Sequence, residues 1–141
     1  MQRGRRLAFD FGDVRIGVAV CDPDGILASP VTTLKTGDRD LENQLRALCD
    51  EYEPIAIYIG KPSNMDGSSG AAVDKAESFG HLVAGVTQAQ ISFIDERMST
   101  VSASRSMRDS GVTAKDAKSR IDQAAAVAIL EFALSIEKNR P

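Results

Sequence analysis

Three carboxylates stand at positions where acidic side chains are unusual. Asp10 lies inside the apolar run at residues 7–12, Glu96 ends another apolar stretch, and Asp122 interrupts the alanine-rich stretch 121–130. A buried carboxylate is costly unless it is paired or binds a cation. Three such acids could hold hard divalent ions such as Mg²⁺ or Mn²⁺, which prefer oxygen ligands. Two such ions can activate water and stabilise the leaving oxygen in phosphodiester hydrolysis.

Each of these acids also has a purely structural interpretation. Asp10 could cap the turn that follows its strand through its own side chain. Only one of Asp95 and Glu96 can point into a given site, because side chains alternate between the two faces of a strand, and either could cap the next helix. Spacing alone favours a surface position for Asp122, near the positive end of its helix. The residue types therefore permit a metal site without requiring one.

The remaining composition excludes several other kinds of site. His81 is the only histidine, and Cys21 and Cys49 form no CxxC pair, so a zinc site is not expected. We expect both cysteines to be buried free thiols in a reducing cytoplasm. No apolar run approaches the roughly 20 residues that a membrane span needs. These features predict a cytoplasmic protein with no membrane contact.

The charge is distributed unevenly along the chain. The net charge of −3 divides into +2 over residues 1–20, +4 over residues 97–121 and −9 over the rest. Such asymmetry would allow a local phosphate-binding face on an acidic molecule. On charge alone, an ordinary solvated helix face explains the second basic segment equally well.

The elements that must position these acids can be predicted from apolar periodicity and turn residues. Two strands at about 7–12 and 14–21 have hairpin spacing, and a third at 26–34 contains Pro30, which favours an edge strand. The strands that end near Asp10 and near Glu96 would have to be neighbours in the sheet for these two carboxylates to meet at the strands' carboxyl ends. Further strands are expected at 55–60 and 90–94, and helices at about 38–52, 71–84, 99–110 and 117–137. The last helix is expected to pack through Ile121, Ala125, Ala128, Ile129, Phe132 and Ile136.

This element order predicts an α/β fold for residues 1–141 as one domain. Alternation of strands and helices after an opening meander implies a mixed five-stranded sheet, an antiparallel meander plus two further strands, flanked by helices.

Four stretches of the chain together resemble the YqgF/RuvX family of RNase H-like nucleases. They are residues 10–20, 60–67, 95–100 and 118–130. The family is described both as pre-16S rRNA nucleases and as Holliday junction resolvases. The first stretch alone also resembles the start of sugar kinases and actin-like ATPases, but 141 residues are too few for that two-domain architecture. The chain departs from the usual family pattern at Asp13, Lys61 and Ser63.

The resemblance implies an RNase H-like fold in which Asp10, Glu96 and Asp122 are the catalytic ligands of Mg²⁺ or Mn²⁺. It further implies a nucleic-acid substrate, pre-rRNA or branched DNA, acted on by a monomer or a homodimer. A non-catalytic nucleic-acid-binding module remains the third alternative. The residues that would contact the substrate are Arg15, Asn64, Arg97 and Lys118.

Overall fold

The computed structural model describes residues 2–61, 71–96 and 115–139. Its elements follow the expected order within these ranges. The chain forms β1 (Arg6–Phe11), β2 (Arg15–Cys21), β3 (Ala28–Lys35), α1 (Leu41–Tyr52), β4 (Ala56–Lys61), α2 (Ala71–Ala84), β5 (Gln90–Asp95) and α4 (Lys115–Lys138). The helix expected at 99–110 lies outside the described residues.

The five strands form one mixed sheet in the order β3-β2-β1-β4-β5. The first three make an antiparallel meander, and β4 and β5 add parallel to β1. The meander and the edge position of β3 confirm the sequence-based expectations. Pro30 lies opposite Ala19, where the β2–β3 register shifts between Val18 and Ala19. An edge strand accommodates proline because one of its sides needs no ladder donors.

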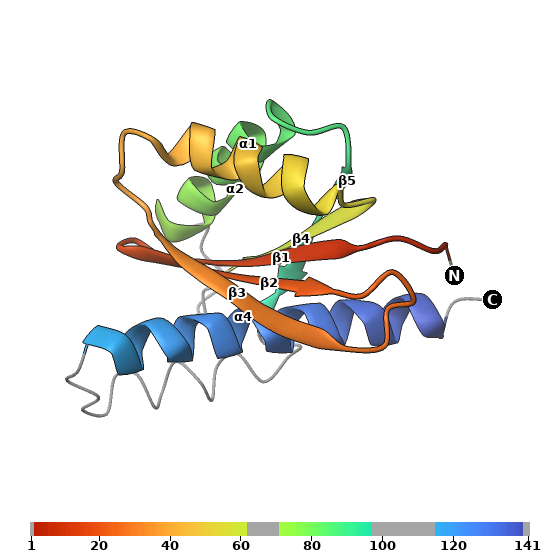
Figure 1. Ribbon diagram of the computed structural model, residues 1–141. Coiled ribbons are helices and arrows are strands. Elements are labelled where there is room, and N and C mark those ends of the chain that lie inside the picture. The colour runs from red at the N-terminus through yellow and green to blue at the C-terminus, as the bar shows by residue number, and fades with distance from the viewer. Residues whose placement is uncertain (1, 62–70, 97–114, 140–141) are drawn as a thin grey trace.

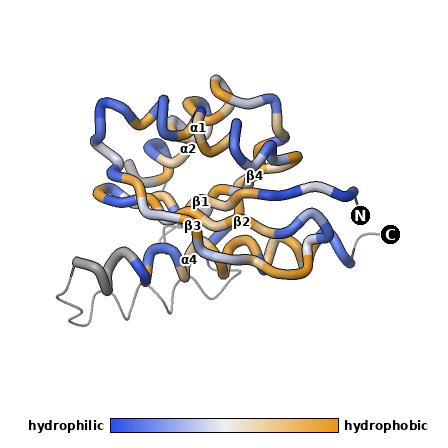
Figure 2. Tube along the Cα trace, in the orientation of Figure 1, coloured by the Kyte–Doolittle hydropathy of each residue, from blue (hydrophilic) through white to orange (hydrophobic). Residues whose placement is uncertain are grey.

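Among the described helices, α1 and α2 cover one face of the sheet and α4 covers the other (Figure 1). The two faces of the sheet differ because the strands carry large side chains on one face and small ones on the other. Large residues of β1 and β2 point towards α1 and α2, whereas Ala8, Gly17 and Ala19 point towards α4. Small side chains allow an alanine-rich helix to pack closely on the sheet. Figure 2 shows the resulting apolar stretches along the central strands and along α4.

The core between the sheet and helices α1 and α2 is built from aromatic and branched residues. Phe79 of α2 lies with its ring centroid 5.4 Å from that of Phe9 and 5.1 Å from that of Phe11. The inward positions of α2 are those that helical spacing predicts: Ala76, Phe79 and Val83 are buried.

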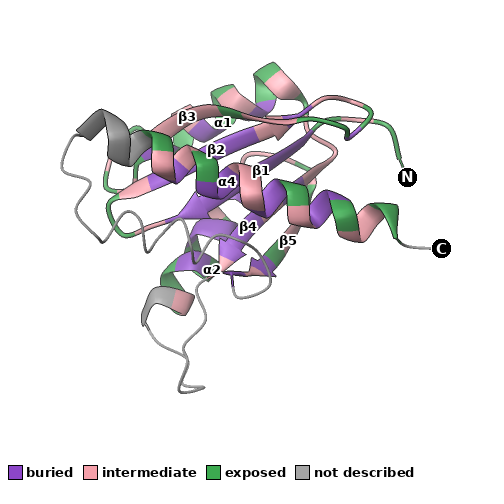
Figure 3. Ribbon diagram, turned by 90° about the horizontal axis from the view of Figure 1, so that it is seen from below, coloured by how far each residue is buried: buried purple, intermediate pink, exposed green. Residues whose placement is uncertain are grey.

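Helix α4 packs on the sheet through a face that differs from the predicted one. Ala125 and Ile129 are buried as expected, but Ile121, Ala128, Phe132 and Ile136 are only half-buried. The helix is rotated by about one residue relative to the prediction, because its small and branched residues pack against the sheet better than Phe132 would. Figure 3 shows the buried positions along the sheet-facing side of α4. These buried positions are Asp122, Ala125, Ala126, Ile129, Leu130, Ala133 and Leu134.

A charged cluster ties the C-terminal part of α4 to the sheet. Arg6 of β1 is fully buried, and it donates to both carboxylate oxygens of Glu137, at 2.9 and 3.2 Å. Tyr58 of β4 donates its hydroxyl to the same carboxylate at 2.7 Å. Such a two-pronged arginine–carboxylate pair constrains geometry as well as contributing energy. It holds α4 in a defined position along the sheet, and Asp122 lies on the same helix.

Cys21 and Cys49 are buried free thiols, as the sequence predicts. Within the part of the chain that the structure describes, no helix is long and apolar enough to cross a membrane.

Candidate active site

Asp10 lies on the face of the sheet that α4 covers. It follows Ala8 by two positions on β1, and alternation along a strand places both on the same face. Its side chain is buried, at 2% exposure. In the sheet it is paired with Gly17 of β2 on one side and with Gly60 of β4 on the other. Asp10 is therefore a buried carboxylate on the α4 face of the sheet.

Asp122 reaches the same region because α4 packs directly on β2 at Gly17. A Cβ atom at Gly17 would lie 2.0 Å from the carbonyl oxygen of Asp122, so only glycine allows the helix to approach this closely. Gly17 is the register partner of Asp10, and the contact therefore sets the first turns of α4 beside the first carboxylate. Asp122 is 1% exposed. The surface position that spacing favoured for Asp122 is wrong, because the rotation of α4 turns this residue inwards.

Glu96 follows β5 and is also buried, at 7% exposure. Ile94, two residues earlier on β5, belongs to the core beneath α4. Strands β1 and β5 are not direct neighbours, because β4 lies between them. Gly60 of β4, which is paired with both Asp10 and Ile94, presents no side chain between them. Its missing Cβ makes room for Ile129 of α4.

Arg15 forms the strongest electrostatic contact that the structure records at this site. Its Nε atom lies 2.6 Å from Oδ2 of Asp122. The arginine begins β2, two residues before Gly17, and its side chain therefore lies on the α4 face. About a quarter of the side chain is exposed to solvent. The guanidinium thus supplies positive charge to a region where three carboxylates are buried.

The three acids suit a hard divalent ion by donor type, but their present positions do not form a metal cage. All donors are carboxylate oxygens, which Mg²⁺ and Mn²⁺ prefer. Among the described residues, no group of three or more histidine, cysteine, aspartate or glutamate side chains could hold a metal ion as arranged. One physical reason is visible, since Asp122 is already engaged by Arg15.

The side chains of the other three residues predicted to contact the substrate are not among those that the structure describes. Asn64 and Arg97 lie outside the described residues, and for Lys118 the structure describes only its place in the first turn of α4. The structure describes two of the three residues that depart from the usual family pattern. Asp13 is exposed and pairs with Lys75 at 3.4 Å, and Lys61 pairs with Glu77 at 2.8 Å; Ser63 is not among the described residues.

Sequence reasoning missed two contacts that position the site. One is the packing of Asp122 on Gly17, although the Arg15-x-Gly17 spacing was noted as part of a motif. The other is a hydrogen bond of 3.1 Å from the side-chain amide of Gln123 to the hydroxyl of Thr33. It joins α4 to the edge strand β3. Both involve residues far apart in the chain, so local patterns carried no signal for them.

Comparisons with known proteins agree with this architecture. The sequence profile of the RuvX family, described as Holliday junction resolvase, matches residues 4–136. A protein of Streptomyces coelicolor named "Putative pre-16S rRNA nuclease" is 50% identical over 140 residues, covering 98% of this chain and 84% of its own length. A protein of Mycolicibacterium smegmatis with the same name is 44% identical over 134 residues, covering 92% of this chain and 79% of its own.

A solved structure supports the fold independently of sequence. The structure titled "T. thermophilus RuvC in complex with Holliday junction substrate" superposes with a TM-score of 0.63 at 11% identity, covering 96% of each chain. At that identity the likeness concerns the fold, which is RNase H-like. With a family match over nearly the whole length and relatives above 40% identity, this chain belongs to the RuvX family.

Proposed function

We propose that this protein is a metal-dependent nuclease that hydrolyses phosphodiester bonds at the 5′ end of precursor 16S rRNA. The observation that carries the proposal is the burial of three carboxylates from distant parts of the chain: Asp10 on β1, Glu96 directly after β5 and Asp122 on α4. Unrelated structural roles would not require three carboxylates under one helix. The names of the relatives support the choice of substrate.

In this proposal, Asp10, Glu96 and Asp122 would hold Mg²⁺ or Mn²⁺. Two such ions supply an activated water and stabilise the leaving oxygen of a phosphodiester. The protein's own part is to keep the carboxylates dry and to fix their directions through the sheet and α4. Arg15 would bind a phosphate of the substrate, because guanidinium groups recognise phosphate oxygens with paired hydrogen bonds.

The remaining assignments belong to the same proposal. Asn64, Arg97 and Lys118 would add contacts to the substrate backbone around the scissile bond. Residues 1–141 would act as one nuclease domain in the cytoplasm, where precursor rRNA is processed. The oligomeric state would follow from the substrate. Two symmetric cuts in a four-way junction need two sites and therefore two copies, whereas a single cut in RNA needs one.

A cleavage assay with two substrates tests this function. Purified protein with Mg²⁺ or Mn²⁺ is given a 5′-extended 16S rRNA precursor and, separately, a four-way DNA junction. Asp10→Asn preserves side-chain volume and removes the charge, so we expect it to fold and to lose cleavage by at least about a hundredfold. Asp50→Asn, which changes an exposed acid of α1, is the matched control and should cleave normally.

The outcomes separate the candidates. Cleavage of the RNA, lost in Asp10→Asn, supports the proposal. Full activity in Asp10→Asn would overturn the assignment of the site. Symmetric nicking of the junction alone would favour a resolvase, the second candidate, which the description of the family supports. Binding without cleavage of either substrate by folded protein would favour the non-catalytic module.

A further inference from the structure

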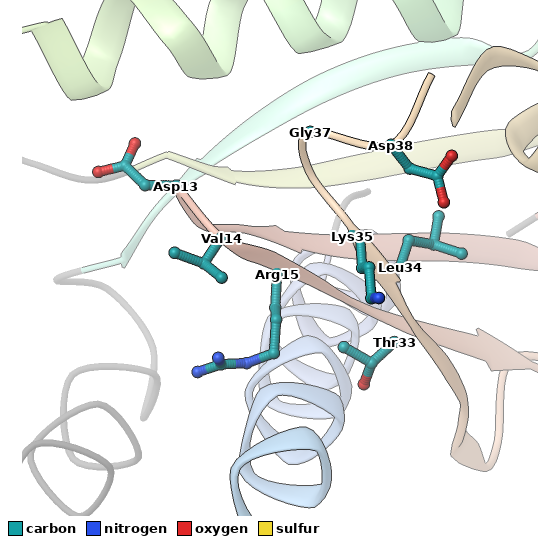
Figure 4. Close-up of a pocket in the computed structure, with 8 residues that line it drawn as sticks. All are labelled: Asp13, Val14, Arg15, Thr33, Leu34, Lys35, Gly37 and Asp38. Atoms are coloured by element: carbon teal, nitrogen blue, oxygen red, sulfur yellow. The ribbon is translucent and has the colours of Figure 1, made fainter. Parts of the chain in front are cut away.

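A pocket of about 670 Å³ opens beside the candidate site, between the β1–β2 turn and the end of β3 (Figure 4). Its size falls within the range of roughly 300–1,000 Å³ that is usual for small-ligand sites. Val14, Arg15, Thr33, Leu34, Lys35 and Asp38 contribute to its lining. Val14 lies in the turn before β2 and Asp38 follows β3, whereas the other four residues lie on these two paired strands.

Arg15 belongs both to this pocket and to the carboxylate site. Its side chain lines the pocket while its Nε binds Asp122 at 2.6 Å. Lys35 is its register partner on β3, so the two cations stand side by side on the sheet. A strand whose phosphate lies at the carboxylates would therefore pass Arg15, and its next nucleotide would reach the pocket.

The lining of the pocket suits a nucleobase better than a phosphate. Val14 is 67% exposed, an unusual state for an apolar side chain in a concave region, and a stacked base would remove it from water. Leu34 is buried in the core on the α1 and α2 side of the sheet, so Val14 is the exposed apolar side chain of this lining. Bases of unpaired nucleotides also stack on arginine guanidinium planes, and Arg15 supplies such a plane at the wall shared with the site.

The charges of the lining also favour a nucleobase over a phosphate. Arg15 pairs with Asp122 and Asp13 with Lys75. The lining contains Asp13 and Asp38 as well as the two cations, so a phosphate inside the pocket would meet two carboxylates. Asp38 accepts a backbone hydrogen bond from Asp40 through one oxygen, at 2.8 Å. Its second oxygen can accept from an amino or imino group of a base. A neutral base with donor groups fits inside, while its phosphate stays at the mouth with the cations.

We propose that this pocket binds the base of the unpaired nucleotide adjacent to the scissile phosphate. The inference rests on the proposed nuclease function for its orientation, and it adds a base-binding subsite to that function. It makes the substrate a single-stranded segment at the point of cleavage, because a base paired in a helix could not enter.

Binding of single-stranded RNA with single abasic positions tests the subsite without any catalysis. A fluorescein-labelled octanucleotide from the 5′ end of the precursor is titrated with wild-type protein in EDTA, and each base is removed in turn. We expect one position to weaken binding by about threefold to tenfold when its base is missing. In Val14→Ser, which changes an exposed residue, that difference should disappear.

Ile26→Ser is the matched control. Ile26 is also an exposed apolar turn residue, but it lies at the other end of β2, so the abasic effect should persist in this variant. Restoring Mn²⁺ should then place the cut next to the responding position.

The design separates this inference from the proposed function. An abasic effect that depends on Val14, in a protein that cleaves nothing, would support the pocket and overturn the nuclease. Equal binding of all abasic oligonucleotides by an active enzyme would overturn the pocket alone. So would equal binding of the octanucleotide and of its perfect duplex.

Discussion

Arg15 and Asp122 are joined by a 2.6 Å ion pair between the start of β2 and the first turns of α4. Asp122 is almost fully buried, whereas the arginine remains partly open to solvent. Asp10 and Glu96 are buried as well, and Arg15 offsets the negative charge of Asp122. It also occupies a carboxylate that a divalent ion would need. If the proposed metal site is correct, the pair places Arg15 in competition with the metal.

Removing this competition is expected to tighten metal binding. In Arg15→Gln, we expect Mn²⁺ to bind about threefold to tenfold more tightly in the absence of nucleic acid, because the site gains net negative charge. RNA affinity should fall in the same variant, because a phosphate contact is lost. Titration calorimetry or the Mn²⁺ electron paramagnetic resonance signal measures the first effect, and fluorescence anisotropy the second.

The control for Arg15→Gln is Arg46→Gln, which breaks an exposed pair with Glu42 on α1. It should alter neither quantity. Weaker Mn²⁺ binding in Arg15→Gln would show that the arginine supports the metal site instead of competing with it.

Gly17→Ala should destabilise the protein and displace the start of α4. The added Cβ would meet backbone of Asp122 at 2.0 Å, and backbone cannot move aside as a flexible side chain can. We expect a loss of at least about 1–3 kcal/mol, the usual cost of overpacking, measured by urea unfolding. Gly37→Ala is the control, because a Cβ there meets nothing within 4 Å. Equal stability of the two variants would contradict the packing described here.

The buried cluster at the other end of α4 predicts a large effect of Arg6→Met. This change removes both hydrogen bonds that Arg6 donates to the largely buried Glu137 carboxylate. Breaking a buried pair by removing one partner costs about 3–5 kcal/mol. By contrast, Arg3→Gln breaks the exposed pair with Asp24 and should cost about 0–1 kcal/mol. Similar unfolding free energies for both variants would show that the cluster does not hold α4.

The two thiols predict a dependence of stability on alkaline pH. Burial raises the pKa of Cys21 and of Cys49 above the ordinary thiol value. Unfolded thiols ionise near about 8.5, whereas the folded ones remain protonated to higher pH. The stability contribution is therefore complete below that value and is lost as the pH rises towards the folded pKa. Native protein at pH 8 should accordingly react slowly with a thiol reagent, and urea-unfolded protein should react at both cysteines at once. Rapid reaction of the native state would contradict this burial.

Much of the fold could be predicted from residue patterns alone. Tight turns and alternating apolar residues indicated the β1–β2–β3 meander, and the three-to-four-residue spacing of apolar positions indicated α2, since these periods arise from backbone geometry within a single element. The three carboxylates also stood out locally, because each interrupts an apolar or alanine-rich context. The resemblance of four motifs then identified the family that the comparisons confirmed.

The features that could not be predicted from the sequence depend on contacts between distant parts of the chain. Strand β4 inserts between β1 and β5, so the strand that carries Asp10 and the strand that leads to Glu96 share no ladder. Asp122 is buried because of the rotation of α4. This position of the helix requires the absence of a Cβ atom at Gly17, and that requirement arises only when the helix packs on β2. Arg15 and Asp122 are 107 residues apart. Local periodicity carries no information about such pairs, since their energy comes from burial and charge that exist only after the sheet and α4 have come together.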